Sequence, residues 1–584
     1  MPTLDWIGKD KVINHHKDVP YKVLERKYSF DESGMHKEDI HSNNMIIHGD
    51  NLEALKSLLS QYEGKIKCIY IDPPYNTGNE GWIYNDNVND PKIKKWLGEV
   101  VGKEGEDLSR HDKWLCMMYP RLVLLQKLLA DDGVIFISID TNELYNLKNI
   151  CDEIFGANCF VEDVSWQRTY SMRNDVKGIA AEVEHILVYG KLPYWQPNKL
   201  KRTEKMDSKY KNPDNDPRGA WRNIVASAPN ASTHQGMVYA IQNPYTGEFA
   251  YPPQGRCWSL GQEQMLEAMN KWYSYKLSDI HDEKKRAEIC GVPKEKIRRD
   301  VLAIVIDGSL EDAMKRAKEI NNNVLPEFYF SRNGKGTLSR KAYINQVGGR
   351  PVTNFWSFEE TGHTDEASRL LKAMFDGKVV FDTPKPPRMI ERILQITGNE
   401  ETLILDSFAG SGTTAHAVLN MNKSDGGNRK FILVEMGDYA DTITAERVKR
   451  VINGYGEGKN AVEGTGGNFS YYELGNPLFM QDGTINNEVD ITEVRKYVWY
   501  TETNGIEYKE DIQEKYFLGS YNDTAYYFYY EKDRVTILDY EFLTSVHKKE
   551  QAYVMYADSC ALSDSDLQKW NITFKKIPRD IEHI

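Results

Sequence analysis

Apolar and polar residues alternate along the first third of the chain with the periods of strands and helices. Short runs rich in β-branched and aromatic residues predict strands at 45–48, 68–71, 134–140 and 185–189. Between them, apolar residues at helical spacing predict helices from Asn51, over 113–133 and over 143–155. This alternation predicts an α/β fold with a mostly parallel sheet.

The same order returns late in the chain. Helices are predicted at 366–375 and 388–396, then a strand at 402–406, a Gly-rich turn, a helix from Thr413 and a strand at 430–436. Residues 192–350 between the two blocks are rich in Asn, Pro, Gly and Trp and have no regular period, except for a charged stretch at 280–321 that we predict to be helical. The predicted domains are therefore an N-terminal arm (1–43), two halves of one α/β domain (44–191 and 351–468), an insert (192–350) and a Tyr-rich C-terminal α/β domain (469–584).

Bulk properties narrow the class of protein. A chain of 584 residues is too long for one hydrophobic core, and it contains no apolar run long enough to span a membrane and no signal peptide at its start. Seven cysteines without a C-x-x-C pair argue against disulfides and zinc. The pair His15-His16 has no carboxylate or Cys at ligand spacing, so we predict no metal. We expect a cytoplasmic protein with no membrane association.

The net charge of −13 argues against a uniformly basic surface. Basic residues are nevertheless concentrated in the insert: 191–222 holds nine Lys and Arg against four acids, and 331–343 holds Arg332, Lys335, Arg340 and Lys341 with no acid. Either cluster could be an ordinary solvated face. Together they make the insert the candidate for a nucleic-acid surface.

The strand at 68–71 ends at Asp72-Pro73-Pro74-Tyr75. Neither proline can donate to a strand ladder, and each fixes φ near −65°, so the corner is rigid. It would hold the Asp72 carboxylate, the Pro73 carbonyl and the Tyr75 ring at the carboxyl end of a strand, where open α/β sheets bind ligands. A tight turn with a buried tyrosine is the alternative. The polar stretch 76–112 that follows is long for a connector and is predicted to be a functional cover.

A second motif, DSFAGSGTTAHAV at 406–418, lies between a strand and a helix. Gly410 and Gly412 permit close approach of a ligand to the main chain, and the helix that begins near Thr413 offers N–H groups to an anion. One strand later, Glu435 could accept hydrogen bonds from both hydroxyls of a ribose. A purely structural turn is the alternative. The motif is neither G-x-G-x-x-G nor a P-loop, so phosphate is not the obvious ligand.

The two motifs together resemble a family. DPPY at 72–75 followed by FAGSG at 408–412 is similar to the β-class amino-methyltransferases that modify exocyclic nitrogens of DNA bases with S-adenosylmethionine. HGDNLEAL (48–55), NPDNDPRGAW (212–221) and TPKPPRMIERIL (383–394) further resemble the modification (Mod) subunit of type III restriction-modification systems and related site-specific enzymes. The resemblance covers nearly the whole chain.

This resemblance implies a circularly permuted, Rossmann-like methyltransferase sheet, with 44–191 as its catalytic half, 351–468 as its cofactor-binding half and the insert as a target-recognition domain. The implied reaction moves a methyl group to the N6 amine of an adenine that has left the duplex. Asp72 and Pro73 would accept the amino hydrogens, Pro74 would keep the corner rigid, and Tyr75 would stack on the base. Asp at the first motif position favours adenine, as a tendency of the family.

The resemblance also assigns cofactor residues. Phe408, Gly410, Ser411 and Gly412 would surround the methionine part, with Asp406, Thr383 and Lys385 near its amino-acid end, Glu435 at the ribose and Asp50 at the adenine ring. Asp50 could instead cap the following helix. Thr383 and Lys385 could be no more than a strand exit before Pro386.

The implied partners are double-stranded DNA, a second copy of the chain in a homodimer, and a restriction subunit with helicase and nuclease activity. The candidate DNA-binding residues are Lys201, Arg202, Arg218, Arg222, Arg332, Lys335, Arg340 and Lys341. Three alternatives stay open: an N4-cytosine methyltransferase, a DNA-recognition subunit with vestigial catalysis, and an amino-methyltransferase for RNA or protein.

Overall fold

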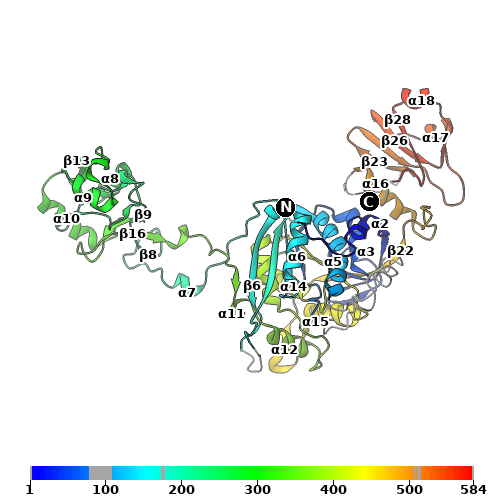
Figure 1. The fold of residues 1–584 in the computed structure, drawn as a ribbon, viewed down its shortest axis with the longest axis horizontal. Coiled ribbons are helices and arrows are strands. Elements are labelled where there is room, and N and C mark those ends of the chain that lie inside the picture. Colours follow the sequence, from blue (N-terminus) through cyan, green and yellow to red (C-terminus); the bar gives the residue numbers. More distant parts are fainter. Residues whose placement is uncertain are drawn as a thin grey trace. The chain divides into compact units, whose positions relative to one another are not determined.

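The computed structural model describes residues 3–77, 108–171, 178–503, 506, 508–509 and 514–581. They form two compact units, one of Lys199–Pro351 and one of the chain on either side of it, Met1–Asn198 with Val352–Ile584 (Figure 1). We predicted the insert at 192–350. Most of the cover predicted at 76–112 lies outside the described residues.

The larger unit is built on an eleven-stranded sheet. Its order is β17 (Phe355–Trp356), β6 (Phe160–Gln167), β7 (Val183–Gly190), β5 (Leu129–Ile139), β4 (Ile66–Ile71), β18 (Leu403–Asp406), β19 (Lys430–Glu435), β3 (Met45–His48), β22 (Asn468–Pro477), β1 (Lys22–Asp31) and β2 (Gly34–His36). The six strands from β5 to β22 are parallel, whereas β7 and β1 run against their neighbours. The predicted α/β class is confirmed.

The DPPY strand β4 and the FAGSG strand β18 are neighbours, with Cys68 opposite Ile404 and Ile69 opposite Leu405. The chain leaves β4 for β5 through α5 (Leu108–Leu128), and it leaves β18 in the other direction for β19 through α14 (Thr413–Asp425). Opposite departures from adjacent parallel strands open a crevice at their carboxyl ends. Both motifs therefore border one crevice, although more than 330 residues separate them.

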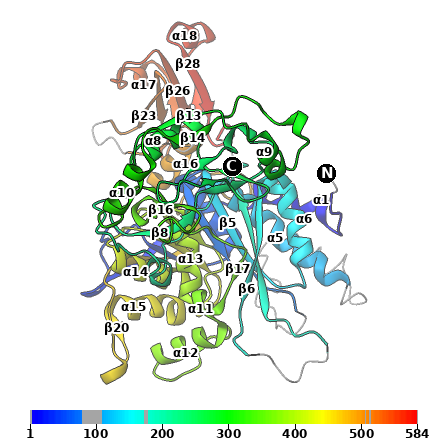
Figure 2. The ribbon, with the colours of Figure 1, turned by 90° about the vertical axis from the view of Figure 1, so that its left-hand side faces the viewer.

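Helices cover both faces of the sheet (Figure 2). On one face lie α5 and α6 (Leu144–Cys151), with α3 (Asn51–Tyr62) packed against α5, and on the other α13 (Pro387–Thr397), α14 and α15 (Glu446–Asn453). Side chains along β4 point alternately to the two faces of the sheet. Ile69 and Ile71 join the core with Trp114 of α5, whereas the Cys68 thiol faces Thr397 of α13. Buried apolar side chains on both faces hold the sheet rigidly at the height of the crevice.

Two predicted domain boundaries fall inside this sheet. β1 belongs to the predicted N-terminal arm, and β22 begins at the predicted start of the C-terminal domain, yet the two strands pair with each other and β22 pairs with β3. We also predicted no strand at 160–167, where β6 lies; the adjacent acids Glu162 and Asp163 interrupt its apolar residues. The C-terminal region has a sheet of its own, made of β23 (Phe517–Tyr521), β24 (Thr524–Phe528), β26 (Ala552–Ala557) and β28 (Ile572–Lys576).

The smaller unit contains a four-stranded sheet and a three-stranded sheet. The first consists of β11 (Phe249–Ala250), β10 (Ile241–Gln242), β14 (Ala303–Ile306) and β13 (Tyr275–Ser278), the second of β15 (Phe328–Phe330), β16 (Leu338–Tyr343) and β8 (Trp221–Val225). The prediction that 280–321 is helical was only partly right. That stretch contains α9 (Glu283–Cys290) and α10 (Leu310–Asn321), but also β14, whose Ile304 is fully buried in a core with Trp272.

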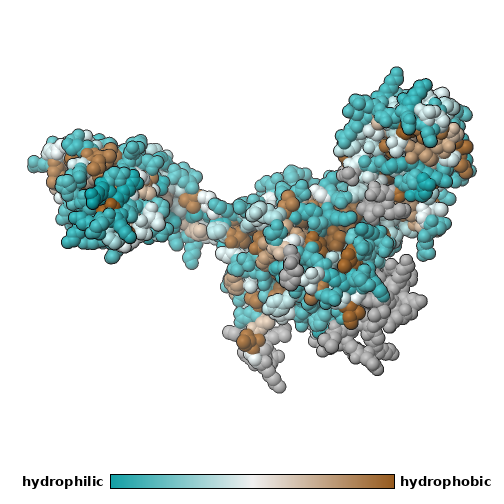
Figure 3. All heavy atoms as spheres, turned by 45° about the horizontal axis from the view of Figure 1, so that its top comes forward, coloured by the Kyte–Doolittle hydropathy of each residue, from teal (hydrophilic) through white to brown (hydrophobic). Residues whose placement is uncertain are grey.

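Further helices and paired strands complete the described fold. The helices are α1 (Lys9–Val12), α2 (His15–Asp18), α7 (Glu204–Asp207), α8 (Gln262–Met269), α11 (Phe358–Thr361), α12 (Thr364–Met374), α16 (Ile491–Thr503), α17 (Tyr540–Thr544) and α18 (Asp564–Lys569). The paired strands are β9 (Ser227–Pro229) with β12 (Arg256–Trp258), β20 (Gly454–Tyr455) with β21 (Val462–Glu463), and β25 (Ile537–Leu538) with β27 (Ser559–Cys560). Hydrophilic residues cover most of the face drawn in Figure 3. None of the helices in the described ranges is long and apolar enough to cross a membrane.

Candidate active site and recognition surface

The DPPY corner follows directly on β4 and is held from both sides. The indole N–H of Trp114 donates to the Pro74 carbonyl at 2.7 Å, and the Tyr75 hydroxyl donates to Asp72 Oδ1 at 2.9 Å. Pro73 is buried. These contacts keep the Asp72 carboxylate and the Tyr75 ring in one mutual orientation. A rigid corner of this kind is what the two prolines in the sequence led us to expect.

The structure places Lys385 on this corner. Its Nζ lies 2.8 Å from Asp72 Oδ1, 2.7 Å from Asp72 Oδ2 and 2.9 Å from the Tyr75 hydroxyl oxygen, and 5.0 Å from the centre of the Tyr75 ring. Burial disfavours its charged form, but the charges of Asp72 and Glu184 outweigh burial and raise the pKa of Lys385. The resemblance placed Lys385 near the amino-acid end of the cofactor, whereas its ammonium group here binds Asp72, the first residue of DPPY.

Glu184 on β7 completes the cluster. It is buried, accepts from Arg168 Nη1 at 2.7 Å and from the Tyr75 hydroxyl at 3.2 Å, and lies 3.6 Å from Lys385 Nζ. Burial would raise its pKa, but the charges of Lys385 and Arg168 lower it. Glu184 directly precedes the strand predicted at 185–189, and neither sequence motif assigned it a role. The cluster balances two carboxylates with two cations.

The free acceptor positions of this cluster fit an amino group. A carboxylate offers about four acceptor positions. At Asp72, Oδ1 uses two for Tyr75 and Lys385, and Oδ2 uses one for Lys385, so one position on Oδ2 remains. No donor in the described chain bonds to the Pro73 carbonyl. These two positions are equal in number to the two hydrogens of an exocyclic amine.

The FAGSG turn requires glycine at two places. Gly410 has φ 51°, and a Cβ there would meet Phe381 Cζ at 3.1 Å; Gly412 has φ 79°, and a Cβ there would meet the Thr444 carbonyl oxygen at 3.0 Å. Both backbone conformations are costly for other residues. The turn is therefore packed closely against Phe381 and Thr444.

Two buried acids support this turn. Glu435 accepts from the Gly410 N–H at 2.7 Å and the Gly437 N–H at 2.8 Å, and burial raises its pKa. Asp406 accepts from the Phe408 N–H at 3.1 Å and the Thr414 hydroxyl at 2.5 Å, and burial raises its pKa to about 7. Neither acid has a cationic partner among the described residues, so each depends on these N–H and hydroxyl donors for stabilisation.

Two cofactor candidates, Asp50 and Thr383, lie outside the FAGSG turn. Asp50 caps α3, accepting from the N–H groups of Leu52 at 2.8 Å and Glu53 at 3.3 Å, which is the alternative that its position allowed. Thr383 is exposed and has φ 49°, a strained conformation for a β-branched residue. The roles of Asp50 at the adenine ring and of Thr383 near the amino-acid end stay predictions.

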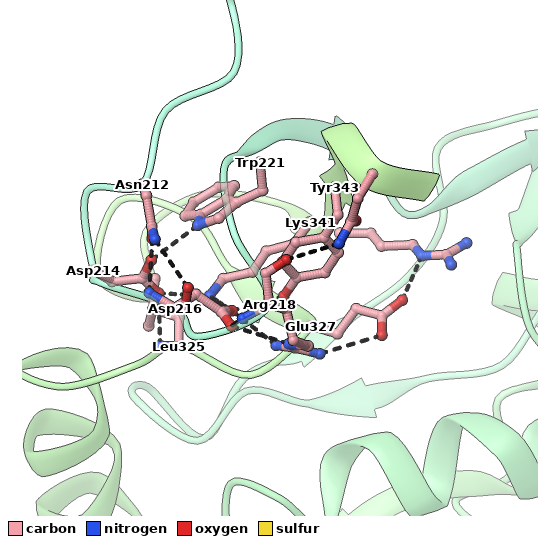
Figure 4. A network of polar contacts seen from close by, with 11 residues as sticks. Asn212, Asp214, Asp216, Arg218, Trp221, Leu325, Glu327, Lys341 and Tyr343 are labelled. Carbon is pink, nitrogen blue, oxygen red and sulfur yellow. Dashed lines mark hydrogen bonds and ion pairs between the residues drawn. The ribbon is translucent and has the colours of Figure 1, made fainter. Parts of the chain in front are cut away.

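In the smaller unit, Lys341 is not available to DNA. Its side chain is fully buried, and its Nζ lies 2.5 Å from Asp214 Oδ2 and 2.7 Å from Asp216 Oδ2 (Figure 4). The Tyr343 hydroxyl also donates to Asp216, at 2.7 Å, and the Trp221 indole N–H donates to Asp214 at 2.8 Å. The prediction that Lys341 binds DNA is wrong. Lys341 points inward from β16 and ties that strand to the loop of the 212–221 motif.

The other basic candidates fall into two groups. Three have carboxylate partners: Arg218 with Asp216 at 2.9 Å, Arg340 with Glu327 at 2.8 Å and Arg202 with Asp207 at 2.6 Å. Four are exposed, and no carboxylate of the described residues pairs with them: Lys201, Arg222, Arg332 and Lys335. The second group keeps the properties expected of phosphate contacts.

Comparison with known proteins agrees with the two motifs. A family model for DNA methylases matches residues 66–446. The type III restriction-modification enzyme StyLTI Mod subunit of Salmonella typhimurium is 30% identical over 478 residues, which cover 77% of this chain and 62% of that protein. The EcoP15I Mod subunit of Escherichia coli is 30% identical over 478 residues, which cover 78% and 66%. The chain thus spans less than two thirds of the length of these relatives.

Among solved structures, the PvuII DNA methyltransferase, described as cytosine-N4-specific, is 11% identical with a TM-score of 0.32, covering 69% of this chain and 86% of that one. At this score the likeness adds nothing to the topology seen in the chain itself.

Proposed function

The chain belongs to the DNA methylase family, and on that basis we propose that it is a site-specific DNA methyltransferase that modifies the N6 amine of adenine with S-adenosylmethionine. The observation that carries the proposal is the pair of free acceptor positions on Asp72 Oδ2 and the Pro73 carbonyl, beside the FAGSG turn.

The lone pair of an exocyclic amine is delocalised into the base, so the amine needs help to become a nucleophile. Acceptors at Asp72 and Pro73 would hold its two hydrogens and favour a tetrahedral nitrogen. Lys385 and Tyr75 keep the Asp72 carboxylate fixed while this happens. The Tyr75 ring would stack on the base after it leaves the duplex, a step that costs a few kcal/mol and is offset by such contacts.

The residues around the FAGSG turn fit the cofactor. When bound, S-adenosylmethionine supplies a methyl group activated by a positively charged sulfur. Asp406 and Glu435 would complement that charge. The hydroxyl of Ser407, beside Phe408, is buried and has no hydrogen-bond partner among the described residues, as expected of a turn that receives a polar ligand.

Adenine is proposed over cytosine because Asp72, and not Ser, occupies the first position of the motif. The similarity to Mod subunits supports a role in a restriction-modification system with a separate restriction subunit. We further propose that the chain acts as a homodimer on double-stranded DNA, and that the smaller unit recognises the target with Lys201, Arg222, Arg332 and Lys335 among its contacts.

Long-read sequencing of DNA from a methylation-free host that expresses this chain, beside Asp72→Ala, tests the proposal. N6-methyladenine at one short motif, absent with the variant, is the expected result. N4-methylcytosine would support the same active site with cytosine as the target base. An absence of marks with both chains would overturn a self-sufficient methyltransferase.

A further inference from the structure

Arg447 on α15 is a buried cation without a counter-charge. Its side chain is fully buried, and no carboxylate of the described chain lies within 4 Å of its guanidinium group. A buried charge of this kind costs several kcal/mol unless another group compensates it. Burial lowers the pKa of Arg447 to about 9, so the group still carries its charge at neutral pH.

The hydrogen bonds of Arg447 all go to the first turn of α14 and its flank. Nη1 donates to Ser411 Oγ at 2.8 Å, to Thr413 Oγ1 at 2.8 Å and to the Ser411 carbonyl at 3.4 Å. Nη2 lies 3.2 Å from Nδ1 of His416, whose pKa is held well below its usual value by burial and by the charge of Arg447. Nε has no partner. None of these neutral groups compensates the charge.

These contacts set the direction of two hydroxyl protons. Because Ser411 Oγ and Thr413 Oγ1 both accept from Arg447, each hydroxyl must donate elsewhere. Thr413 donates to the Lys385 carbonyl at 3.2 Å. For Ser411, the nearest acceptor in the described chain is Thr413 Oγ1 at 3.5 Å, a weak contact. The Ser411 proton is therefore free to donate to a ligand.

The same turn already favours an anion. α14 has thirteen residues, and the N–H groups of its first turn have no acceptor within the helix. Three features thus coincide at one place: the positive end of a helix, a hydroxyl that can donate, and a buried cation behind them.

We propose that Arg447 is the counter-charge of the cofactor's amino-acid carboxylate, which the first turn of α14 and the Ser411 hydroxyl bind directly. This inference rests on the proposed function, since it takes S-adenosylmethionine as the ligand. Arg447 is a positioning residue, because it acts through Ser411 and Thr413 and does not itself reach the ligand. The turn before α14 is then specific for a ligand that carries a carboxylate.

Calorimetric titration with S-adenosylmethionine and with its decarboxylated analogue tests this role. Wild type is expected to bind S-adenosylmethionine about 10- to 100-fold more tightly than the analogue. In Arg447→Met, the affinity for S-adenosylmethionine should fall by a similar factor, while the affinity for the analogue should stay within about twofold. Arg447→Lys should recover part of the loss, because it restores the charge.

A matched control is Arg429→Met, which removes a buried arginine that is paired with Asp425 at the far end of α14. It should leave both affinities unchanged. Ser411→Ala keeps Arg447 in place and removes one donor, so it covers the case in which Arg447→Met fails to fold; it should weaken S-adenosylmethionine alone, by several-fold.

Three results would overturn the inference. An equal loss for both ligands in Arg447→Met would show a purely structural role. A wild type that binds the two ligands equally would show that the carboxylate is not recognised. A wild type that binds neither ligand would remove the proposed cofactor itself, and it would be recognised by the absence of binding in every variant.

Discussion

A lysine between two carboxylates, with a tyrosine hydroxyl beside them, occurs in each unit. The larger unit has Lys385 with Asp72, Glu184 and Tyr75, and the smaller has Lys341 with Asp214, Asp216 and Tyr343. The composition is the same, but the exposure differs. The Asp72 side chain is 26% exposed, whereas that of Asp216 is fully buried.

The two clusters also differ in how far their acceptors are used. Asp216 receives five hydrogen bonds, from Lys341, Tyr343 and three N–H groups of Arg218, and they exceed the roughly four acceptor positions of a carboxylate. Asp72 receives three from the described residues and keeps one position on Oδ2. The saturated cluster stabilises a loop, whereas the unsaturated one can bind a substrate. Residue type alone does not separate these roles.

Asp72→Ala should have the largest effect. Removal of the acceptor is expected to lower the methylation rate by about 10²- to 10⁴-fold, a typical range for a group that engages protons in the transition state. Asp72 is partly exposed and Lys385 keeps Glu184 as a partner, so the melting temperature should fall less than in Asp216→Ala. Radiolabelled methyl incorporation and a thermal melt measure the two. A variant that melts far below wild type would show that the two clusters are alike.

Asp216→Ala should reverse this pattern. It leaves Lys341 and Arg218 with one buried partner fewer, and removing one member of a buried ion pair costs about 3–5 kcal/mol. Urea unfolding of the full chain measures this loss of stability. Protease cleavage within the smaller unit reports its unfolding. Asp207→Ala removes the partner of Arg202 in a more exposed pair and should cost less than about 1 kcal/mol. Equal costs in the two variants would contradict a structural role for Asp216.

Lys385→Met tests whether Lys385 supports Asp72 or binds the cofactor. Because its Nζ lies on Asp72, we expect the turnover number to fall by about 10- to 100-fold while the affinity for S-adenosylmethionine changes less than threefold. Initial rates under saturating cofactor and a binding titration separate the two. If affinity falls and turnover does not, Lys385 acts at the amino-acid end of the cofactor, as the sequence resemblance implied.

Cofactor affinity should depend on pH through Asp406. Its pKa is raised to about 7 in the folded chain, so it is protonated below that pH and ionised above it. A cationic ligand favours the ionised form, so affinity should rise by up to about tenfold per pH unit below pH 7 and level off above it. Titrations between pH 5.5 and 8.5 measure this, and Asp406→Asn should remove the dependence.

Asp406 also affects the free energy of unfolding, and this effect has the opposite pH dependence to its effect on cofactor affinity. Between about pH 4 and pH 7 the folded chain holds a proton on Asp406 that the unfolded chain has lost, so this contribution to the free energy of unfolding falls as pH rises through that window. Urea unfolding of the ligand-free chain should show a shallower pH dependence in Asp406→Asn. A steeper one would contradict the assignment.

The smallest effects are expected from exposed basic residues. Arg332→Ala should weaken DNA binding by several-fold for all sequences alike and reduce the slope of log affinity against log salt by about 0.9, as expected of one phosphate contact. Lys318→Ala on α10 is a control outside the basic clusters. Loss of one base preference in the recognition sequence, with an unchanged salt slope, would instead mark Arg332 as a base contact.

The sequence by itself determined the elements that carry the two motifs. β3 was predicted with its exact bounds and β18 and β19 within a residue at one end, because short apolar runs bounded by polar residues record strands that are buried on both faces. The corner at Asp72 and the turn at Gly410 were also predictable, since proline and glycine restrict the backbone locally. Their residue types suggested the chemistry before any contact was known.

Only the tertiary structure decided which side chains meet. Lys385 reaches Asp72 from more than 300 residues away, and Glu184 reaches both from a third segment. Lys341 looked like a surface charge in a basic stretch, but the pairing of β16 turns it towards Asp214 and Asp216. Local patterns set backbone conformation, whereas the protonation state, exposure and role of a charged side chain depend on neighbours that only the folded sheet brings within a few ångströms.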